Sequence, residues 1–216
     1  MLNLDITIII IIAANVLISL RGFNDMSFFE RFKFHIGGIR QGQQIRMISS
    51  AFLHADTMHL FFNMFTLYFF APLVVQYAGQ FQFILIYFGS LLVGNLLSFL
   101  FHKDEYQYSA VGASGAVSGI IYAGILFRPD MSLYLMFIPI PIPAYVFGIG
   151  YLLYSIFGMK NKIGNVGHDA HFGGAVGGYV ITLALFPSLI QQHLLMVILL
   201  AIPIIILFIM QRLGKL

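Results

Sequence analysis

Long apolar runs with very few charges recur along this chain, and they restrict its fold more than any other feature of the sequence. The chain is 60% hydrophobic and 9% charged, whereas soluble domains carry about 25% charged residues. An apolar run of about 20 residues is long enough to cross the hydrocarbon core of a bilayer as a helix. The sequence therefore predicts an all-α polytopic integral membrane protein.

Two further counts narrow the possible functions. The net charge of +3 is spread over the connections and forms no basic stripe, so we expect no nucleic-acid partner. Cysteine is absent from the sequence, which excludes disulfides and thiolate chemistry.

Seven apolar segments predict seven membrane-spanning helices in a single domain, residues 1–216. The expected spans are about 4–20, 54–78, 81–101, 114–127, 144–158, 168–187 and 191–211. The first follows MLNLD, which has an acid in place of the basic residues of a signal peptide, so we expect a span there. A long semi-polar connection, residues 21–53, follows it. Before the fifth span, FIPIPIPAY has proline at every second position, which excludes a regular helix and favours extended or polyproline structure.

Polar residues that can do chemistry collect on one membrane face. Because the chain changes side with every span, the second, fourth and sixth spans begin on the same face, near His54, Ser114 and His171. Residues 114–127 make about 21 Å of helix, while the hydrocarbon core is about 30 Å thick. Ser114 is therefore expected roughly 10 Å below the surface. The unpaired N–H groups of that first turn need water, which predicts a recessed polar cavity.

Ser114 and His171 are the residues that we expect to react together. A serine hydroxyl is a poor nucleophile until a base accepts its proton, and histidine is the usual base near neutral pH. A serine in a membrane helix more often bonds only its own backbone. An intramembrane histidine beside it, however, favours a functional site.

Glycines allow the close packing that this pair requires. Small residues four apart let two membrane helices approach each other. Such pairs are Gly115 with Gly119 in the fourth span and Gly174 with Gly178 in the sixth. Gly112 and Gly115 also allow the chain to turn sharply around Ser114.

The motifs around these residues resemble those of rhomboid intramembrane serine proteases. The matching stretches are FLHADTMHLFFNM at 52–64, GASG at 112–115 and AHFGGAVGG at 170–178. The resemblance implies a six-helix bundle with an additional C-terminal transmembrane helix. It also implies that Ser114 is the nucleophile and His171 its general base, in a dyad without an acid. Asp169 lies near this base but on another side of its helix.

The second span is expected to supply the oxyanion site. His59 and Asn63 are four residues apart and share a helix face, and both side chains can donate a hydrogen bond to a developing negative charge. The resemblance gives them this role together with the Ser114 backbone N–H. His54 would lie about 140° around the helix from His59. We therefore expect it to point elsewhere and to connect the first loop to the bundle.

The sequence also departs from the family pattern. The position four after the serine, often aromatic in rhomboids, is Ser118 here, which leaves the packing on His171 open. Of the Trp-Arg pair usual in the first loop, QIRM retains only Arg46. His168 is an extra histidine that would either tune the base or face water in the cavity. The stretch FFERFKFHIGG of the first loop is expected to lie in the membrane interface.

Charge and resemblance disagree about orientation. On the segment boundaries above, ten of the eleven Lys and Arg residues fall on the Ser114 face, and only Arg128 falls opposite. The positive-inside rule would turn that face to the cytoplasm, whereas rhomboids turn it to the exterior or lumen. Because half of these charges belong to a loop expected at the headgroups, we follow the family.

Two other functions compete with serine proteolysis. The histidines with Asp169 could ligate zinc, but H-E-x-x-H, expected of a membrane metalloprotease, does not occur. A catalytically silent rhomboid-like binding factor would have the same fold, since fold alone does not establish activity. The resemblance implies a bacterial cell membrane, transmembrane segments of other proteins as substrates, and no metal or organic cofactor.

Overall fold

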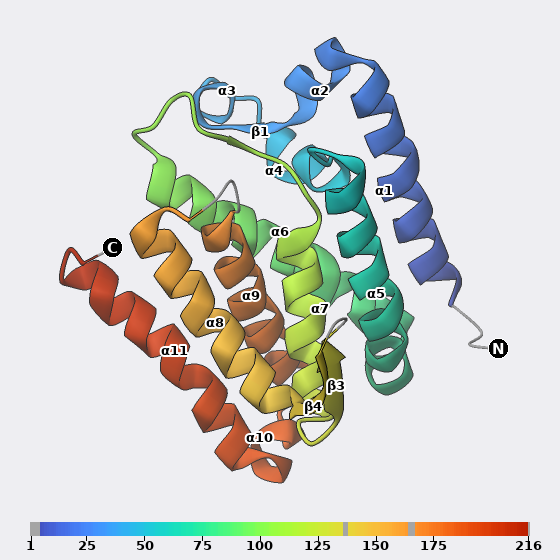
Figure 1. The fold of residues 1–216 in the computed structure, drawn as a ribbon, viewed down its shortest axis with the longest axis vertical. Helices are drawn as coiled ribbons and strands as arrows, with labels where there is room; N and C mark the ends of the chain where they lie inside the picture. The colour runs from blue at the N-terminus through green and yellow to red at the C-terminus, as the bar shows by residue number, and fades with distance from the viewer. Residues whose placement is uncertain (1–4, 136–137, 164–166, 216) are drawn as a thin grey trace.

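The computed structural model of the protein describes residues 5–135, 138–163 and 167–215. These residues form an all-α bundle with two short two-stranded sheets at its connections (Figure 1). The long helices are α1 (Ile6–Asn24), α5 (Thr57–Ala78), α6 (Gln80–His102), α7 (Ser114–Phe127), α8 (Ala144–Asn161), α9 (His168–Leu185) and α11 (Leu194–Arg212). Helices α1, α5, α6 and α11 are long and apolar enough to cross a membrane. The predicted all-α polytopic fold is confirmed.

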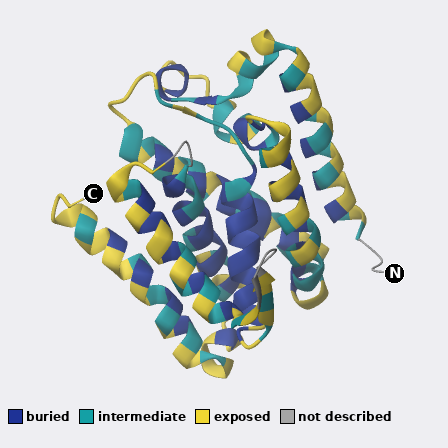
Figure 2. Cartoon of the chain, viewed as in Figure 1, coloured by how far each residue is buried: buried dark blue, intermediate teal, exposed yellow. Residues whose placement is uncertain are grey.

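Helix α7 forms the centre of the bundle. Every residue from Gly115 to Phe127 is buried, and Figure 2 shows this helix almost wholly in the colour of buried residues. Its sequence allows this position, because it is apolar or small on all sides and such a helix is stable only when surrounded. The short helix that begins with Ser114 is therefore enclosed by its neighbours.

Large apolar side chains cover the outer surface of the surrounding helices. Leu17 of α1, Phe69 of α5, Phe81 of α6 and Leu195 of α11 are each more than half exposed. Soluble monomers rarely expose continuous apolar surface on this scale. The outer surface of the bundle is therefore one that lipid, not water, solvates.

Glycines bring α7 and α9 into direct backbone contact. A Cβ atom added to Gly174 of α9 would overlap the backbone of Gly115 in α7, and one added to Gly178 would overlap Gly119. A Cβ on Gly94 of α6 would lie 2.7 Å from a carbonyl oxygen of α9. No larger side chain separates these helices at the contacts, so their spacing is set by the backbones themselves.

The connection at residues 21–53 is more ordered than its composition indicates. Helix α1 continues to Asn24, past the expected end, and short elements follow it. They are α2 (Met26–Phe32), β1 (Phe34–His35), α3 (Ile36–Arg40), α4 (Arg46–Ser49) and the 3-10 helix η1 (Ser50–Phe52). Strand β1 pairs with β2 (Ser109–Ala110) in the connection before α7. Arg46 donates to the carbonyl oxygens of Glu30 and Lys33, each at 2.9 Å, and so holds α4 against the end of α2.

The proline-rich stretch forms one strand of a hairpin on the face opposite Ser114. Strand β4 (Ile138–Pro143) pairs antiparallel with β3 (Ser132–Leu135). N–H groups of alternate residues point to the same edge of a strand, so alternating prolines leave the isoleucine N–H groups for the partner. Helix α8 begins directly after the last proline, and α10 (Ser188–Gln192) lies between α9 and α11.

Candidate active site

Ser114 is the first residue of α7, reached through a sharp turn. Gly112 has a φ of +127°, a backbone conformation that glycine adopts without strain. A Cβ at Gly112 would also lie 2.7 Å from the ring of His59. The glycine is therefore required twice, by the turn and by the histidine beside it. Ser114 itself is half-buried at the start of the central helix.

His171 lies in the first turn of α9 and meets the serine. Its Nε2 is 2.6 Å from Ser114 Oγ, a hydrogen bond between residues 57 positions apart in the chain. The glycine contacts between α7 and α9 lie directly below this pair and bring the two first turns together. The structure thus places the two predicted residues within reach of proton transfer.

An aromatic ring, which we did not expect from the sequence, packs on His171. Tyr151 of α8 stacks on the imidazole with ring centroids 6.2 Å apart and an interplanar angle of 16°. Ser118 Oγ donates to the Ser114 carbonyl oxygen at 2.8 Å and lies 2.8 Å from the Tyr151 hydroxyl. Since a serine has one hydrogen to donate, the tyrosine donates to Ser118. The small residue at 118 leaves room for a ring from another helix. This small residue is the feature of the sequence that could have indicated such a ring.

The His59 ring lies against the turn before Ser114, whereas the Asn63 amide is hydrogen-bonded within its own helix. The Asp56 side chain caps α5 by accepting the His59 backbone N–H at 2.8 Å, which fixes the helix start at Thr57. Asn63 Nδ2 donates to the His59 carbonyl oxygen at 2.9 Å. One amide hydrogen of Asn63 remains for a ligand. Within the described residues, Asn63 makes no hydrogen bond to Ser114 or His171.

His54 joins two parts of the chain, and it also contacts His59. Its Nδ1 lies 2.8 Å from Ser19 Oγ of α1, and its Nε2 accepts the Ala113 backbone N–H at 3.4 Å. Its ring centroid is 5.0 Å from that of His59, so the expectation that the two point to different places is wrong. That expectation assumed a helix over both residues, whereas α5 begins only at Thr57.

Two other candidate residues have partners outside the pair. His168 is 3% exposed, and its Nε2 lies 3.1 Å from the Ile163 carbonyl oxygen. Asp169 lies 3.5 Å from His102 Nε2 and does not reach His171. Among the residues that the structure describes, no group of three or more His, Cys, Asp or Glu is arranged to hold a metal ion.

The fold and the site together define a class of protein. It is a polytopic membrane bundle in which a serine and a histidine on two glycine-packed helices are joined by a hydrogen bond. A family model described as the Rhomboid domain matches residues 41–188, more than half of the chain. The chain belongs to the rhomboid family.

Individual relatives agree with this assignment. The chain is 31% identical to RHOMBOID-like protein 12, mitochondrial, of Arabidopsis thaliana over 79% of this chain and 55% of that protein. It is 35% identical to the Putative rhomboid protease YdcA of Bacillus subtilis over 44% of this chain and 48% of that protein. It is 30% identical to the Rhomboid protease GluP of the same organism over 68% of this chain and 27% of that protein. The chain spans about half or less of the length of these curated relatives.

Proposed function

We propose that this chain is an intramembrane serine endopeptidase that cleaves transmembrane segments of other membrane proteins. The hydrogen bond of 2.6 Å between Ser114 Oγ and His171 Nε2 carries the proposal. Membership in the rhomboid family supports it, and two relatives have names that describe them as rhomboid proteases.

In the proposed mechanism, Ser114 Oγ attacks the carbonyl carbon of the scissile peptide while His171 Nε2 accepts the hydroxyl proton. The histidine then gives this proton to the leaving amine, and the substrate is left as an ester of the serine. Water, activated by the same histidine, attacks the ester and releases the carboxylate. Every proton that moves passes through the same ring nitrogen, Nε2 of His171.

Negative charge develops on the carbonyl oxygen in both steps, and donors must face it. The Ser114 backbone N–H is available, because the first N–H groups of a helix have no intrahelical acceptor. The His59 ring lies against Gly112, two residues before the serine. Asn63 can contribute its remaining amide hydrogen, or its second one if the bond to the His59 carbonyl opens.

The surroundings of the pair fit a substrate that is itself a membrane segment. The bundle surface is apolar, so the lipid bilayer is the medium in which a substrate helix arrives.

The relatives include a mitochondrial protein as well as bacterial ones, so the expectation of a bacterial cell membrane is not supported.

Active-site labelling tests the proposal. Purified full chain in detergent is treated with a fluorescent fluorophosphonate and compared with the variants Ser114→Ala and His171→Ala. We expect labelling of the unchanged protein and loss of label in both variants. Ser132→Ala, in the hairpin on the opposite face, serves as the matched control and should label fully. Persistent labelling of Ser114→Ala would show that another serine reacts, and no labelling of well-folded protein would favour a catalytically silent binding role.

A further inference from the structure

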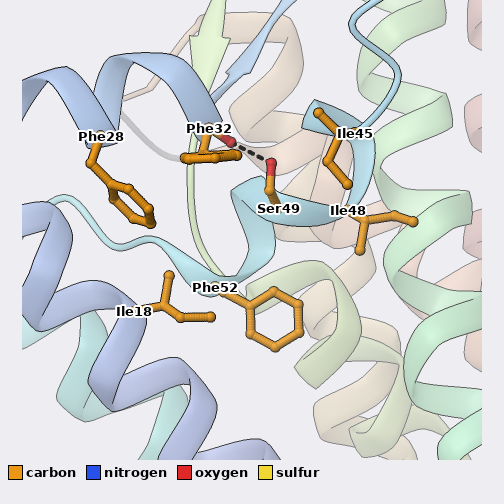
Figure 3. Close-up of a pocket in the computed structure, with 7 residues that line it drawn as sticks. All are labelled: Ile18, Phe28, Phe32, Ile45, Ile48, Ser49 and Phe52. Carbon is orange, nitrogen blue, oxygen red and sulfur yellow. Dashed lines mark hydrogen bonds between the residues drawn. The ribbon is translucent and has the colours of Figure 1, made fainter.

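A small apolar cavity lies in the first connection, between α1, α2 and α4, and neither Ser114 nor His171 lines it. It has a volume of about 230 Å³. Its walls are Ile18, Phe28, Phe32, Ile45, Ile48 and Phe52 (Figure 3). The one polar residue among its walls, Ser49, donates its hydroxyl hydrogen to the Phe32 carbonyl oxygen at 2.7 Å. The walls therefore offer no free donor, and an occupant of this cavity must be apolar.

A second cavity adjoins the first and is basic. It shares Phe28 and Phe32 with the apolar cavity and is also lined by Arg21 and Arg31, with a volume of about 450 Å³. The guanidinium carbon of Arg21 lies 4.5 Å from the Phe28 ring centroid, and that of Arg31 lies 5.5 Å from the Phe32 centroid. Each arginine thus stacks on one of the two rings that separate the cavities.

Neither arginine of the basic cavity is paired directly with a carboxylate of a described residue. Within the described parts of the chain neither guanidinium takes part in an ion pair, while the neighbouring Glu30 pairs with Lys33 at 2.8 Å. The Asp25 carboxylate, which also lines the basic cavity, accepts the Phe28 backbone N–H at 2.9 Å as the cap of α2. The site therefore presents two guanidinium groups against the single carboxylate of Asp25, which leaves a net positive charge directly beside an apolar hollow.

The position of the site is that of the lipid headgroups. Arg21 is in the last turn of α1, where a helix that crosses the membrane leaves the hydrocarbon core. Ile45 is 58% exposed at the outer rim of the apolar cavity, so the hollow communicates with the surroundings of the bundle. The molecules that are apolar at one end, charged at the other and abundant at this depth are phospholipids.

We propose that this paired cavity is a binding site for an anionic phospholipid. The phosphate lies between Arg21 and Arg31, for which guanidinium groups are well suited, and part of one acyl chain enters the apolar cavity. The remainder of the lipid stays in the bilayer along α1. This function is independent of proteolysis, and it accounts for the stretch FFERF, whose aromatic and basic residues play no part in the proposed reaction.

Native mass spectrometry of the purified full chain in detergent tests the proposal. Phosphatidylglycerol is titrated against phosphatidylcholine with the same acyl chains. We expect the unchanged protein to prefer phosphatidylglycerol, and the double variant Arg21→Gln/Arg31→Gln to bind it about 30-fold more weakly, at about fivefold for each charge lost. Arg21→Lys/Arg31→Lys keeps both charges and should retain most of the preference, which separates loss of charge from loss of fold.

Three further arms make the test specific to this site. Arg40→Gln is the matched control, because Arg40 also stacks on a ring, that of Tyr106, on the same face but away from both cavities; it should bind as the unchanged protein does. Ile48→Phe fills the apolar cavity and should weaken phosphatidylglycerol binding while the charges remain. Glycerol 3-phosphate should fail to displace the lipid. Equal binding of the two lipids, an equal loss in Arg40→Gln, or displacement by glycerol 3-phosphate would each overturn the proposal.

Discussion

Tyr151 shows how a single residue on one helix can replace the contribution expected from another. The family often has an aromatic side chain four residues after the serine, and this chain has Ser118 there. The structure fills the space with the ring of Tyr151 from α8, whose hydroxyl is held by Ser118 at 2.8 Å. The imidazole of His171 thus keeps an aromatic neighbour, but its position depends on where α8 lies.

We expect Tyr151→Ala to lower kcat for peptide cleavage about 10- to 100-fold with little change in KM, because a small displacement of the base is costly to the reaction. Tyr151→Phe keeps the ring and should lose only a few-fold. Steady-state cleavage of a quenched fluorescent transmembrane peptide measures both constants. Tyr134→Ala, in the far hairpin, is the matched control. An equal loss in Tyr151→Ala and Tyr151→Phe would show that the hydroxyl, not the ring, is what matters.

At the scale of elements, the contact between α7 and α9 governs the geometry of the site. The two helices touch through Gly115 with Gly174 and Gly119 with Gly178, without side chains between them. A core filled by side chains can absorb a small change by rotamer adjustment. Two backbones in contact cannot, so a change here must move a whole helix.

Gly174→Ala is therefore expected to separate the first turns of α7 and α9 and to abolish fluorophosphonate labelling of Ser114. The added methyl should also destabilise the protein by about 1–3 kcal/mol, as overpacking of a tight core does. Gly150→Ala in α8 is the control, since a Cβ there meets nothing within 4 Å. Labelling intensity and thermal unfolding in detergent are measured for both. Full labelling of a destabilised Gly174→Ala protein would mean that the glycine contact supports the fold without setting the site.

At the scale of the whole molecule, the distribution of charge and the family resemblance indicate opposite orientations of the Ser114 face in the membrane. Most of the basic residues lie on the Ser114 face, yet several belong to the connection at residues 21–53. Two of these have local partners: Arg46 bonds two carbonyl oxygens, and Arg40 donates to the Lys103 carbonyl oxygen at 2.7 Å. Charges held at the membrane surface in this way are a weaker guide to orientation than free loop charges.

We predict that the Ser114 face is turned to the exterior, as the family resemblance implies. The chain has no cysteine, so single cysteines can report on each face without background. Gln41→Cys on the Ser114 face should react with a membrane-impermeant maleimide in intact cells. Asp130→Cys, on the opposite face, should react only after permeabilisation. The reverse pattern would establish that the positive-inside rule holds and the family orientation does not.

Much of this architecture could be predicted because it depends on patterns within single segments. Apolar runs indicated the helices, their alternation put Ser114 and His171 on one face, and glycine spacing indicated which helices touch. What could not be predicted depends on contacts between segments. Tyr151 and Ser118 are far apart in the chain, and the small side chain at 118 does not show which helix supplies the ring. The contact of His54 with His59 arises because α5 begins at Thr57, after the Asp56 cap. The pattern of apolar residues does not define where that helix begins.

The distance along the chain between Ser114 and His171 has a consequence for biosynthesis. During synthesis α7 is completed well before α9 leaves the ribosome, and the proposed nucleophile has no base until the later helix inserts beside it. By the same mechanism, a half-made chain that is surrounded by other newly inserted helices has no activated serine. On the proposed mechanism, activity arises only with the last steps of the chain's own assembly.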